Sequence, residues 1–308
     1  MAYEFIILES DPQTHIARIT LNRPEKMNAH NPGMMEEIKD AIDLVEMDDD
    51  LKVLIFRGTG KSFCSGGDLG QVGRGYGWKE PKPGEKERRP SIRRRLTVDK
   101  RSNEFFQKIF YCSKATIAQV HGYAIGGGFH IALMCDMCIA SDDAKFGHPG
   151  VRIVGPGYHQ NTLLWILRLG VTLAKELDFT GRLMSADEAY RRNVINQVVP
   201  LDQLEGATNK MAETLAQIPA DGVVMGKFTF NLLFDMMGVR SAFDYGAIAH
   251  TLGTNIRYEP DEVNFFKSRR DKGATAAMHE KDERFRGRMD SDARFSGDKD
   301  AQAPKSDT

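Results

Sequence analysis

Three consecutive glycines, Gly126 to Gly128, separate two apolar stretches of this 308-residue chain. The stretch before them, ATIAQVHG (115–122), has the composition of a β-strand, and the stretch after them, FHIALM, is typical of a buried helix. Glycine loses more backbone entropy on folding than other residues, so this turn must require a positive φ or a very close backbone approach. We therefore expect an anion-binding turn at the start of a helix, with His130 in the first helical turn directed at it.

Short apolar strands alternate with helices in the first half of the chain. The predicted strands are 5–10, 16–22, 51–58, 115–122 and 137–141. Asn31 and Pro32 form a typical helix start, and an amphipathic helix is predicted over 34–48. This alternation predicts an α/β fold.

No strand is predicted after residue 180. Ser185 to Glu188 is a capping box that opens a short helix. Three helical segments follow, at 201–217, 220–256 (broken in the middle) and 261–271. The expected regions are a core at 1–200, a helical region at 201–285 and a disordered tail at 286–308. The tail is predicted to be disordered because it has almost no large apolar residues.

Residues 70–101 interrupt the alternation of strands and helices. Glycine, proline and charged residues dominate the first part, which predicts a long surface loop that leads into a helix. Between Lys86 and Arg101 there are eight basic residues and two acidic ones. Two interpretations stay open: a solvated helix face, or a site for a phosphorylated ligand whose oxygens match arginine guanidinium groups.

The overall charge is nearly balanced, with 42 basic and 43 acidic residues, so it gives no reason to expect nucleic acid or a membrane surface as a partner. The N-terminal MAYEFIILES lacks the organisation of a signal peptide, and the C-terminal PKSDT is not a peroxisomal signal. No apolar stretch approaches the roughly 20 residues needed to span a bilayer. We expect a soluble cytoplasmic protein.

Four cysteines are present: Cys64, Cys112, Cys135 and Cys138. Cys135 and Cys138 form a CxxC, but no second pair or histidine cluster at finger-like spacing completes a zinc site. Because these two lie in the apolar segment MCDMCIA, we expect buried structural cysteines and no metal.

Two glycine-containing stretches each follow a predicted strand: KSFCSGGDLG (61–70) and HGYAIGGG (121–128). Neither is the GxxxxGK[ST] of a phosphate loop or the GxGxxG of a dinucleotide site in a strand–turn–helix setting. Together with LNRPEKMNA (21–29), MCD and FTGRLMSADEA…NVINQVVP (179–200), they resemble the crotonase superfamily, the enoyl-CoA hydratase/isomerase family. The resemblance covers about residues 3–271.

The resemblance implies an α/β spiral of ββα units, followed by a helical C-terminal region that mediates trimers. Trimers of this family often pair, so a homotrimer or a dimer of trimers (a hexamer) is expected. The implied substrate is an acyl-CoA thioester, and no cofactor is expected beyond the coenzyme A that belongs to the substrate.

Family members stabilise an enolate or tetrahedral oxyanion with two backbone N–H groups, which fall on Gly67 and Gly127 in this sequence. Glycine lets the thioester oxygen approach the backbone. The helix after Gly127 directs its positive end toward the developing negative charge. This pair of amides would form the oxyanion hole.

The resemblance also implies residues that contact coenzyme A. The candidates near the first motifs are Arg23, Lys26, Met27, Cys64 and Ser65. The C-terminal helix of the family supplies an aromatic and basic residues near the nucleotide, often from a neighbouring subunit. The matching candidates in FFKSRRD are Phe266, Arg269 and Arg270. The basic run at 86–101 is a further candidate for phosphate contact.

This sequence departs from the family at two catalytic positions. Hydratases have one glutamate after the GGG motif and a second in an FGxPE segment, and here these positions are His130 and Gly150. We expect neutral His130 to act as a base or hydrogen-bond donor, because a helix N-terminus disfavours its cationic form. The alternative for His130 is a core histidine bonded to the backbone.

Other candidates for proton transfer lie close by in the sequence. Tyr158 is eight residues after Gly150, where some family members carry an aspartate, and it is either a proton donor or a packing residue. His148 and His159 flank these positions, and histidines so placed fit acid–base work near neutrality.

Addition of water by a glutamate pair is therefore not expected. The leading hypothesis is an enzyme that acts on a CoA thioester through an enolate or tetrahedral oxyanion. Within that class, hydrolytic or retro-Claisen C–C cleavage of an oxoacyl-CoA suits a site with His and Tyr in place of two carboxylates. Hydration, isomerisation or lyase chemistry on an enoyl-CoA through His130 stays open. The alternative from another class is a non-catalytic CoA-binding scaffold.

Overall fold

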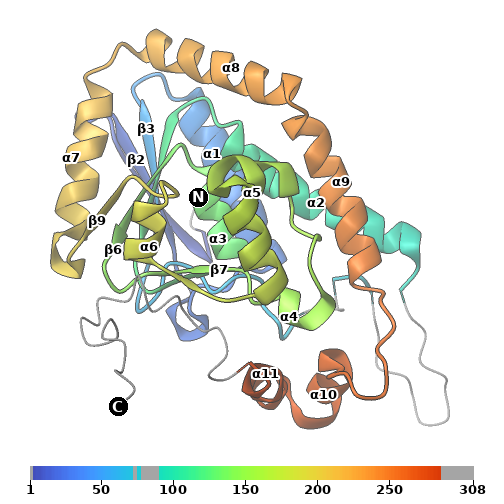
Figure 1. Ribbon diagram of the computed structural model, residues 1–308. Coiled ribbons are helices and arrows are strands. Elements are labelled where there is room, and N and C mark those ends of the chain that lie inside the picture. Colours follow the sequence, from blue (N-terminus) through green and yellow to red (C-terminus); the bar gives the residue numbers. More distant parts are fainter. Residues whose placement is uncertain (1–2, 72–74, 78–89, 286–308) are drawn as a thin grey trace, which may run out of the picture.

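The computed structural model describes residues 3–71, 75–77 and 90–285 (Figure 1). Its larger sheet has six strands in the order β1-β2-β3-β4-β6-β9. β1 and β2 are antiparallel, and each other neighbouring pair is parallel, so crossover connections must join them. The strands are β1 (Ile6–Asp11), β2 (Ile16–Leu21), β3 (Val53–Gly58), β4 (Ala115–Val120), β6 (Met137–Ser141) and β9 (Gln197–Val199).

A second, smaller sheet carries the segments nearest the glycine turns. Its strands are β5 (Tyr123–Ile125), β7 (Lys145–Gly147) and β8 (Met184–Ser185). β5 pairs with β7 in parallel, and β7 pairs with β8 antiparallel. Because β5 leads directly into Gly126 and β7 directly into His148, this sheet fixes where both of those segments begin.

Helices cover the larger sheet and the outside of the molecule (Figure 1). The helices are α1 (Pro32–Met47), α2 (Ile92–Phe110), α3 (Gly127–Met134), α4 (Val151–Val154), α5 (Thr162–Thr180), α6 (Ala186–Arg191), α7 (Leu204–Ala216), α8 (Ala220–Met236), α9 (Val239–Gly253), α10 (Phe265–Lys272) and α11 (Ala274–Glu283). Short 3-10 turns are present at Pro24–Lys26 (η1) and Leu201–Gln203 (η2). Within the described ranges, no helix combines the length and the apolar character that crossing a bilayer would require.

The core forms on both faces of the larger sheet because strand residues alternate between the two faces. In β3, Leu54 and Phe56 belong to the main apolar cluster, which also contains residues of α1, α2, α3 and α5. Val53 and Ile55 belong to a second cluster, together with Leu204 of α7. α3 is buried along its whole length, as its uniformly apolar sequence predicts.

The predicted α/β architecture is confirmed, and the five predicted strands match β1 to β4 and β6 to within two residues. The Asn31 cap is present, since its side chain accepts a hydrogen bond from the Met34 amide at 2.7 Å. The helical segment at 220–256 is broken as predicted, at Gly238, whose φ is 96°.

The expectation of no strand after residue 180 is wrong, because β8 and β9 lie there. Both are too short to show a two-residue period in the sequence, and they form by pairing with β7 and β6. Residues 72–74, 78–89 and 286–308 lie outside the described residues. Most of the expected loop, the start of the basic run and the expected disordered tail therefore stay predictions.

Within the described part of the basic run, Arg95 is used inside the fold. Its guanidinium donates to the Thr254 hydroxyl at 2.8 Å and lies over the Tyr76 ring, 5.1 Å from the centroid. Arg93, Arg94, Lys100 and Arg101 are exposed on α2. The described part of the run is therefore a solvated helix face with one residue that ties α2 to α9.

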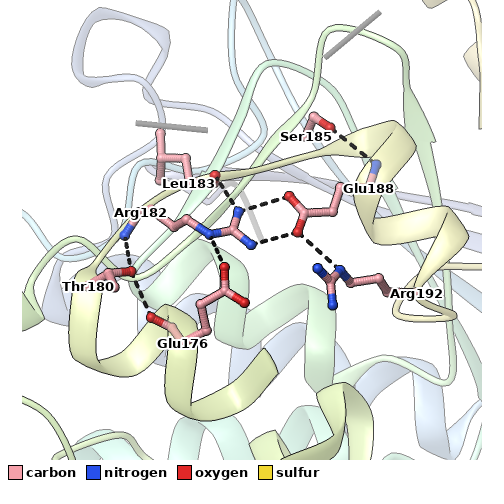
Figure 2. A network of polar contacts seen from close by, with 7 residues as sticks. All are labelled: Glu176, Thr180, Arg182, Leu183, Ser185, Glu188 and Arg192. Atoms are coloured by element: carbon pink, nitrogen blue, oxygen red, sulfur yellow. Dashed lines mark hydrogen bonds and ion pairs between the residues drawn. The ribbon is translucent and has the colours of Figure 1, made fainter. Parts of the chain in front are cut away.

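A buried ion-pair network holds the connection between α5 and α6 (Figure 2). The Arg182 guanidinium donates to both carboxylate oxygens of Glu188, at 2.8 and 2.6 Å, and both side chains are fully buried. Glu176 accepts from Arg182 Nε at 2.8 Å, and Arg192 lies 3.1 Å from Glu188. A Cβ on Gly147 would lie 2.8 Å from the backbone oxygen of Arg182. The network therefore fixes the chain that packs against the end of β7.

Candidate active site

The first glycine turn joins β5 to α3. Gly126 has φ 56°, a conformation that favours glycine, and its N–H donates to the carbonyl of Gly147 at 2.9 Å. Gly128 has no room for a side chain, because a Cβ there would overlap the carbonyl oxygen of Cys64. A left-handed backbone position and close packing on a neighbouring loop thus explain these two glycines.

That neighbouring loop is the second glycine segment. The Cys64 N–H donates to the carbonyl of Tyr123 at 2.9 Å, and the Ile125 N–H donates to the carbonyl of Cys64 at 3.1 Å. A Cβ on Gly66 would lie only 3.2 Å from the amide nitrogen of Gly127. The backbones of the two glycine segments are therefore in direct contact.

The amides of Gly67 and Gly127 have no acceptor among the described residues. The amides on either side of Gly67 are used, one by the Cys64 sulfur at 3.4 Å and the other by the carbonyl of His30 at 2.9 Å. Gly127 is the first residue of α3, so its N–H has no partner within the helix. Backbone N–H groups without a partner on adjacent turns are the kind of donor that an oxyanion hole uses.

His130 lies in the first turn of α3, and its side chain is fully buried. Neither ring nitrogen has a hydrogen-bond partner in the described part of the chain, so the alternative of a core histidine bonded to the backbone does not hold. Burial, and then the neighbouring His148 and His159, hold the pKa of His130 well below its ordinary value of 6.5. The imidazole is therefore neutral near pH 7 and offers one N–H donor and one lone pair.

Three imidazoles gather at this point. The His130 ring stacks on His148 with centroids 5.1 Å apart, and its centroid is 5.4 Å from that of His159. Burial also holds the pKa of His148 well below its usual value. The His159 Nε2–H donates to Asp178 at 2.7 Å, and the His159 ring stacks on Trp165 at 3.8 Å. A carboxylate on one ring nitrogen fixes the tautomer and orientation of the imidazole, which leaves Nδ1 of His159 as an acceptor.

These three histidines are also a group that could hold a metal ion, because one ring nitrogen from each lies within 4.8 Å of the other two. Zinc binds imidazole nitrogens at about 2.0–2.1 Å, so ligand atoms around a tetrahedral zinc lie only about 3.4 Å apart. A separation of at most 4.8 Å is compatible with that spacing, but it does not by itself indicate an ion. The sequence-based expectation of no metal stays a prediction.

The Tyr158 hydroxyl lies in the space that a side chain at position 150 would need, and Gly150 leaves that space open. Its side chain is 7% exposed, and a Cβ built on Gly150 would lie 2.9 Å from the Tyr158 hydroxyl. Burial raises the pKa of Tyr158, so the phenol keeps its proton. The ring centroid lies 5.5 Å from that of His148, which puts an O–H donor beside the histidine cluster.

A second buried network lies next to Tyr158. Asp99 of α2 accepts hydrogen bonds from Tyr76 and from Thr251, both at 2.5 Å, and lies 2.9 Å from Nδ1 of His250. The His250 ring centroid is 5.8 Å from that of Tyr158. This network ties α2 to α9 beside the site, and no motif in the sequence indicated it.

The coenzyme A candidates in the turn at 23–27 differ in whether their side chains are exposed to a ligand. Arg23 is bonded within the fold, since it donates to the carbonyl of Ala29 at 2.5 Å and pairs with Asp68 at 3.0 Å. Lys26 and Met27 are exposed, and Met27 has the left-handed φ of 49°. The exposed pair can meet a ligand directly, whereas Arg23 shapes the turn that presents it.

Cys64 and Ser65 lie on the second glycine loop. The Cys64 thiol is fully buried and donates to the carbonyl of Asn28 at 3.1 Å, and burial raises its pKa to about 12. The Ser65 hydroxyl donates to the carbonyl of Lys26 at 3.3 Å. The other cysteines are buried and free as well, as the apolar surroundings of Cys135 and Cys138 predict.

α10 brings the C-terminal candidates back to the same loop. Arg269 donates to the carbonyl of Leu69 at 2.8 Å. Phe266 packs against the small apolar cluster of α4. Arg270 is more exposed and pairs with Asp271 at 3.1 Å. Arg269 of this chain therefore lies beside the SGGD segment.

A surface cavity of about 480 Å³ lies between α2 and α8. Its lining includes Glu104, Lys108, Tyr111, Phe228, Leu232 and Asp235. None of the glycine-turn or cluster histidine residues lines it, so we assign the chemistry to the glycine turns and not to this cavity.

Two residues of the site carried no signal in the sequence. Asp178 lies in the last turns of α5 and meets His159 only through the fold. His30 lies shortly before α1 in the chain, and its ring lies against Gly127 in the turn between β5 and α3. Neither belongs to a short motif, so only the three-dimensional structure identifies them.

Comparisons with known proteins identify the family of this chain. Residues 11–243 match the family model for enoyl-CoA hydratase/isomerase. A probable enoyl-CoA hydratase of Mycobacterium bovis is 35% identical over 240 residues, which cover 76% of this chain and 84% of that protein. A crotonyl-CoA hydratase of Syntrophomonas wolfei is 35% identical over 214 residues, which cover 69% of this chain and 75% of that protein.

A solved structure shows the same fold. An enoyl-CoA hydratase/isomerase from Xanthobacter autotrophicus Py2 matches with a TM-score of 0.81 at 29% identity, over 92% of this chain and 99% of that one. The predicted crotonase fold is therefore confirmed. The chain belongs to the enoyl-CoA hydratase/isomerase family of the crotonase superfamily, and it is an enzyme of the kind that acts on acyl-CoA thioesters.

Proposed function

We propose that this enzyme cleaves an oxoacyl-CoA with water, by breaking a C–C bond in the retro-Claisen sense. One combination supports the proposal: amides at Gly67 and Gly127 without a partner among the described residues, His130 at one glutamate position, and the Tyr158 hydroxyl next to Gly150 at the other. The amides suit a thioester oxygen that becomes negatively charged. Neither catalytic position holds a carboxylate that could add water across a C=C bond.

In the proposed reaction the two glycine amides bind the thioester oxygen. A neutral imidazole of the histidine cluster takes a proton from water, and the resulting hydroxide forms a bond to the ketone carbon β to the thioester. The bond between the α and β carbons then breaks, and its electron pair forms the thioester enolate. The imidazolium gives its proton to the α carbon, which leaves a carboxylic acid and an acyl-CoA.

His130 is the imidazole that we expect to carry this proton. It lies three residues after Gly127 on the same face of α3, and neither of its ring nitrogens has a hydrogen-bond partner among the described residues. The adjoining His159, oriented by Asp178, can accept a proton on Nδ1 and so supports transfer within the cluster. Tyr158 can donate its O–H to the ketone oxygen. The proposed reaction uses no metal and no cofactor.

We expect coenzyme A to lie along the turn at 23–27 and the second glycine loop. Lys26 and Met27 are exposed there, and Arg269 comes close through its bond to Leu69. A lysine and an arginine at this place provide positive charge for the phosphates of the nucleotide.

A second candidate is hydration or isomerisation of an enoyl-CoA. It is favoured by the names of the relatives, which include a crotonyl-CoA hydratase, and not by the residues at 130 and 150. It would use His130 as a single base in place of a carboxylate pair.

The test is an assay with 2-oxocyclohexanecarboxyl-CoA, crotonyl-CoA and cinnamoyl-CoA, in water and in deuterium oxide. We expect ring opening of the oxoacyl-CoA to be faster than hydration of either enoyl-CoA, with deuterium incorporated at the α carbon. Faster hydration of crotonyl-CoA would favour the second candidate. Tight binding of CoA without turnover or α-proton exchange on any thioester would instead make the protein a non-catalytic scaffold.

A further inference from the structure

His30 is bonded to the second glycine loop through its backbone. Its N–H donates to the carbonyl of Gly66 at 2.8 Å, and its carbonyl accepts from the Asp68 amide at 2.9 Å. These two bonds enclose Gly67, the residue whose amide is unpaired. The position of the His30 backbone is therefore fixed relative to one half of the oxyanion hole.

The His30 side chain extends to the other half. A Cβ on Gly127 would overlap Nε2 of His30 and would lie 2.8 Å from its Cδ2. A Cβ on Gly67 would lie 3.7 Å from Cε1 of the same ring. Since a Cβ is two bonds from its own amide nitrogen, Nε2 lies within about 5 Å of the Gly127 nitrogen. The imidazole thus lies against both glycines of the oxyanion hole.

The ring nitrogens of His30 are available to a ligand. Neither forms a hydrogen bond with a described residue, and neither is among the enclosed atoms that lack a partner, in contrast to those of His130. Phe105 and Phe106 flank the ring, with centroids 6.1 and 6.2 Å away. The apolar side of the ring is therefore packed, and its polar edge stays open.

The protonation state of His30 suits a donor. Burial lowers the pKa of His30 to about 4. The nearby Asp68 raises this pKa and Arg23 lowers it, and both effects are smaller than that of burial. The imidazole is neutral near pH 7 and carries one N–H. A neutral donor can share an oxyanion without the cost of bringing a second full charge into the site.

We propose that His30 is a catalytic residue that donates its ring N–H to the thioester oxygen, as a third donor beside the amides of Gly67 and Gly127. This inference rests on the proposed binding of an acyl-CoA thioester at these amides. It also explains why position 127 must be glycine, since any side chain there would displace the imidazole.

Three variants separate a hydrogen-bonding role from a packing role. His30→Leu keeps the approximate volume and removes the donor, whereas His30→Gln keeps an N–H at a similar distance from the backbone. His15→Asn is the matched control, because His15 lies in the β1–β2 turn with a φ of 61° that asparagine tolerates. Each protein is mixed with acetyl-CoA and with crotonyl-CoA carrying a ¹³C label at the thioester carbonyl.

The first readout is the carbonyl stretching frequency of the bound thioester, which needs no turnover. We expect binding to lower this frequency in the wild type and in His15→Asn, and to lower it clearly less in His30→Leu. The second readout is the rate of α-proton exchange of acetyl-CoA in deuterium oxide. We expect His30→Leu to lose about 10²- to 10³-fold in this rate with little change in the dissociation constant, and His30→Gln to recover part of the loss.

The outcomes are distinguishable. A carbonyl shift and an exchange rate in His30→Leu equal to those of the wild type would overturn the role of His30 and leave the proposed function intact. Equal losses in His30→Leu and His30→Gln, accompanied by weaker CoA binding, would overturn it as well and show a packing role. A wild-type protein that binds neither thioester would overturn the proposed function and this inference together.

Discussion

His130 combines full burial with two ring nitrogens that have no partner among the described residues. A buried polar atom without a partner costs about 1–3 kcal/mol, so a protein keeps one only where something else uses it. In the adjoining rings of His148 and His159, Nδ1 is likewise buried and has no partner among the described residues. At the scale of the residue, the histidine cluster is therefore the part of the molecule that is best explained by a bound substrate.

Replacement of His130 by alanine tests its assigned role. We expect His130→Ala to lower kcat by more than about tenfold, because the proton carrier next to Gly127 is lost, while CoA binding changes little. The measurements are steady-state kinetics and titration with CoA. Ile131→Val, a conservative change on the same helix, is the control. Wild-type turnover in His130→Ala would remove this residue from the mechanism.

Burial of neutral histidines also predicts how stability depends on pH. The pKa of His130 and that of His148 lie well below 6.5 in the folded protein, and that of His30 is about 4. Below about pH 6.5 the unfolded chain binds protons at these rings that the folded protein does not bind. The free energy of unfolding should therefore fall as the pH drops from about 6.5 through the lowered pKa values.

Urea denaturation at about pH 7.5 and at about pH 5 measures this effect. The loss of stability on acidification should be smaller in His130→Leu, which has no ring to protonate. It should be unchanged in His279→Leu, because His279 is exposed on α11. An equal acid sensitivity of the wild type and His130→Leu would show that His130 is not kept neutral by the fold.

At the scale of the element, the turn before α3 depends on what its glycines touch. A Cβ at Gly127 would overlap the His30 ring, whereas one at Gly206, near the start of α7, would meet nothing within 4 Å. We expect Gly127→Ala to lose about 100-fold or more in kcat, because the amide and the ring are both displaced. Gly206→Ala should keep full activity and gain about 0.5–1 kcal/mol in stability. Kinetics and urea denaturation of both variants provide the comparison, and normal kcat in Gly127→Ala would contradict the close contact.

The ion-pair network around Arg182 gives a prediction for stability (Figure 2). Arg182 and Glu188 are both fully buried, so Glu188→Gln leaves a buried guanidinium without its main counter-charge. The expected loss is about 3–5 kcal/mol in the free energy of unfolding, measured by urea denaturation. Arg191→Gln, which breaks an exposed pair with Asp187, should cost less than about 1 kcal/mol. Similar losses in the two variants would contradict a buried Arg182–Glu188 pair.

Most helices and strands could be predicted from short stretches of sequence, because their formation depends on residues that are close together in the chain. The Asn31 cap, the break at Gly238 and the buried helix after Gly126 depend on neighbouring residues, so their signals are contained in short segments. β8 and β9 could not be predicted in this way, because they form by pairing with β7 and β6 and their own sequences show no strand pattern.

The candidate site divides in the same way. Gly67 and Gly127 are assigned through the resemblance of their motifs to the crotonase superfamily, and their role as oxyanion donors stays a prediction. His30 and Asp178 could not be predicted, because a single histidine or aspartate has no meaning until the fold brings it to Gly127 or to His159.

At the scale of the whole molecule, α8 and α9 leave a wide apolar surface uncovered. The exposed side chains are Met225, Phe228, Phe230, Leu232, Leu233, Met236, Met237, Tyr245, Ile248 and Leu252. A concentration of exposed large apolar side chains on two neighbouring helices is typical of an interface between proteins. We propose that it is where copies of this chain meet, as a homotrimer or a dimer of trimers.

Light scattering after size-exclusion chromatography tests this assembly. We expect the wild type to have at least three times the 34.5 kDa mass of one chain. Replacing Phe230 and Leu233 by lysine, one helical turn apart on α8, should yield smaller species. Phe179→Lys, which changes an exposed aromatic on α5 that is not among these side chains, should not. A monomeric wild type would contradict the proposed assembly.

The proposed chemistry requires one arrangement, in which segments distant in the chain present two amides to one oxygen. A crystal structure with a bound, unreactive acyl-CoA analogue measures it directly. The thioester oxygen should lie about 2.7–3.1 Å from the amide nitrogens of both Gly67 and Gly127. A thioester bound elsewhere, or an oxygen that contacts neither amide, would contradict the account.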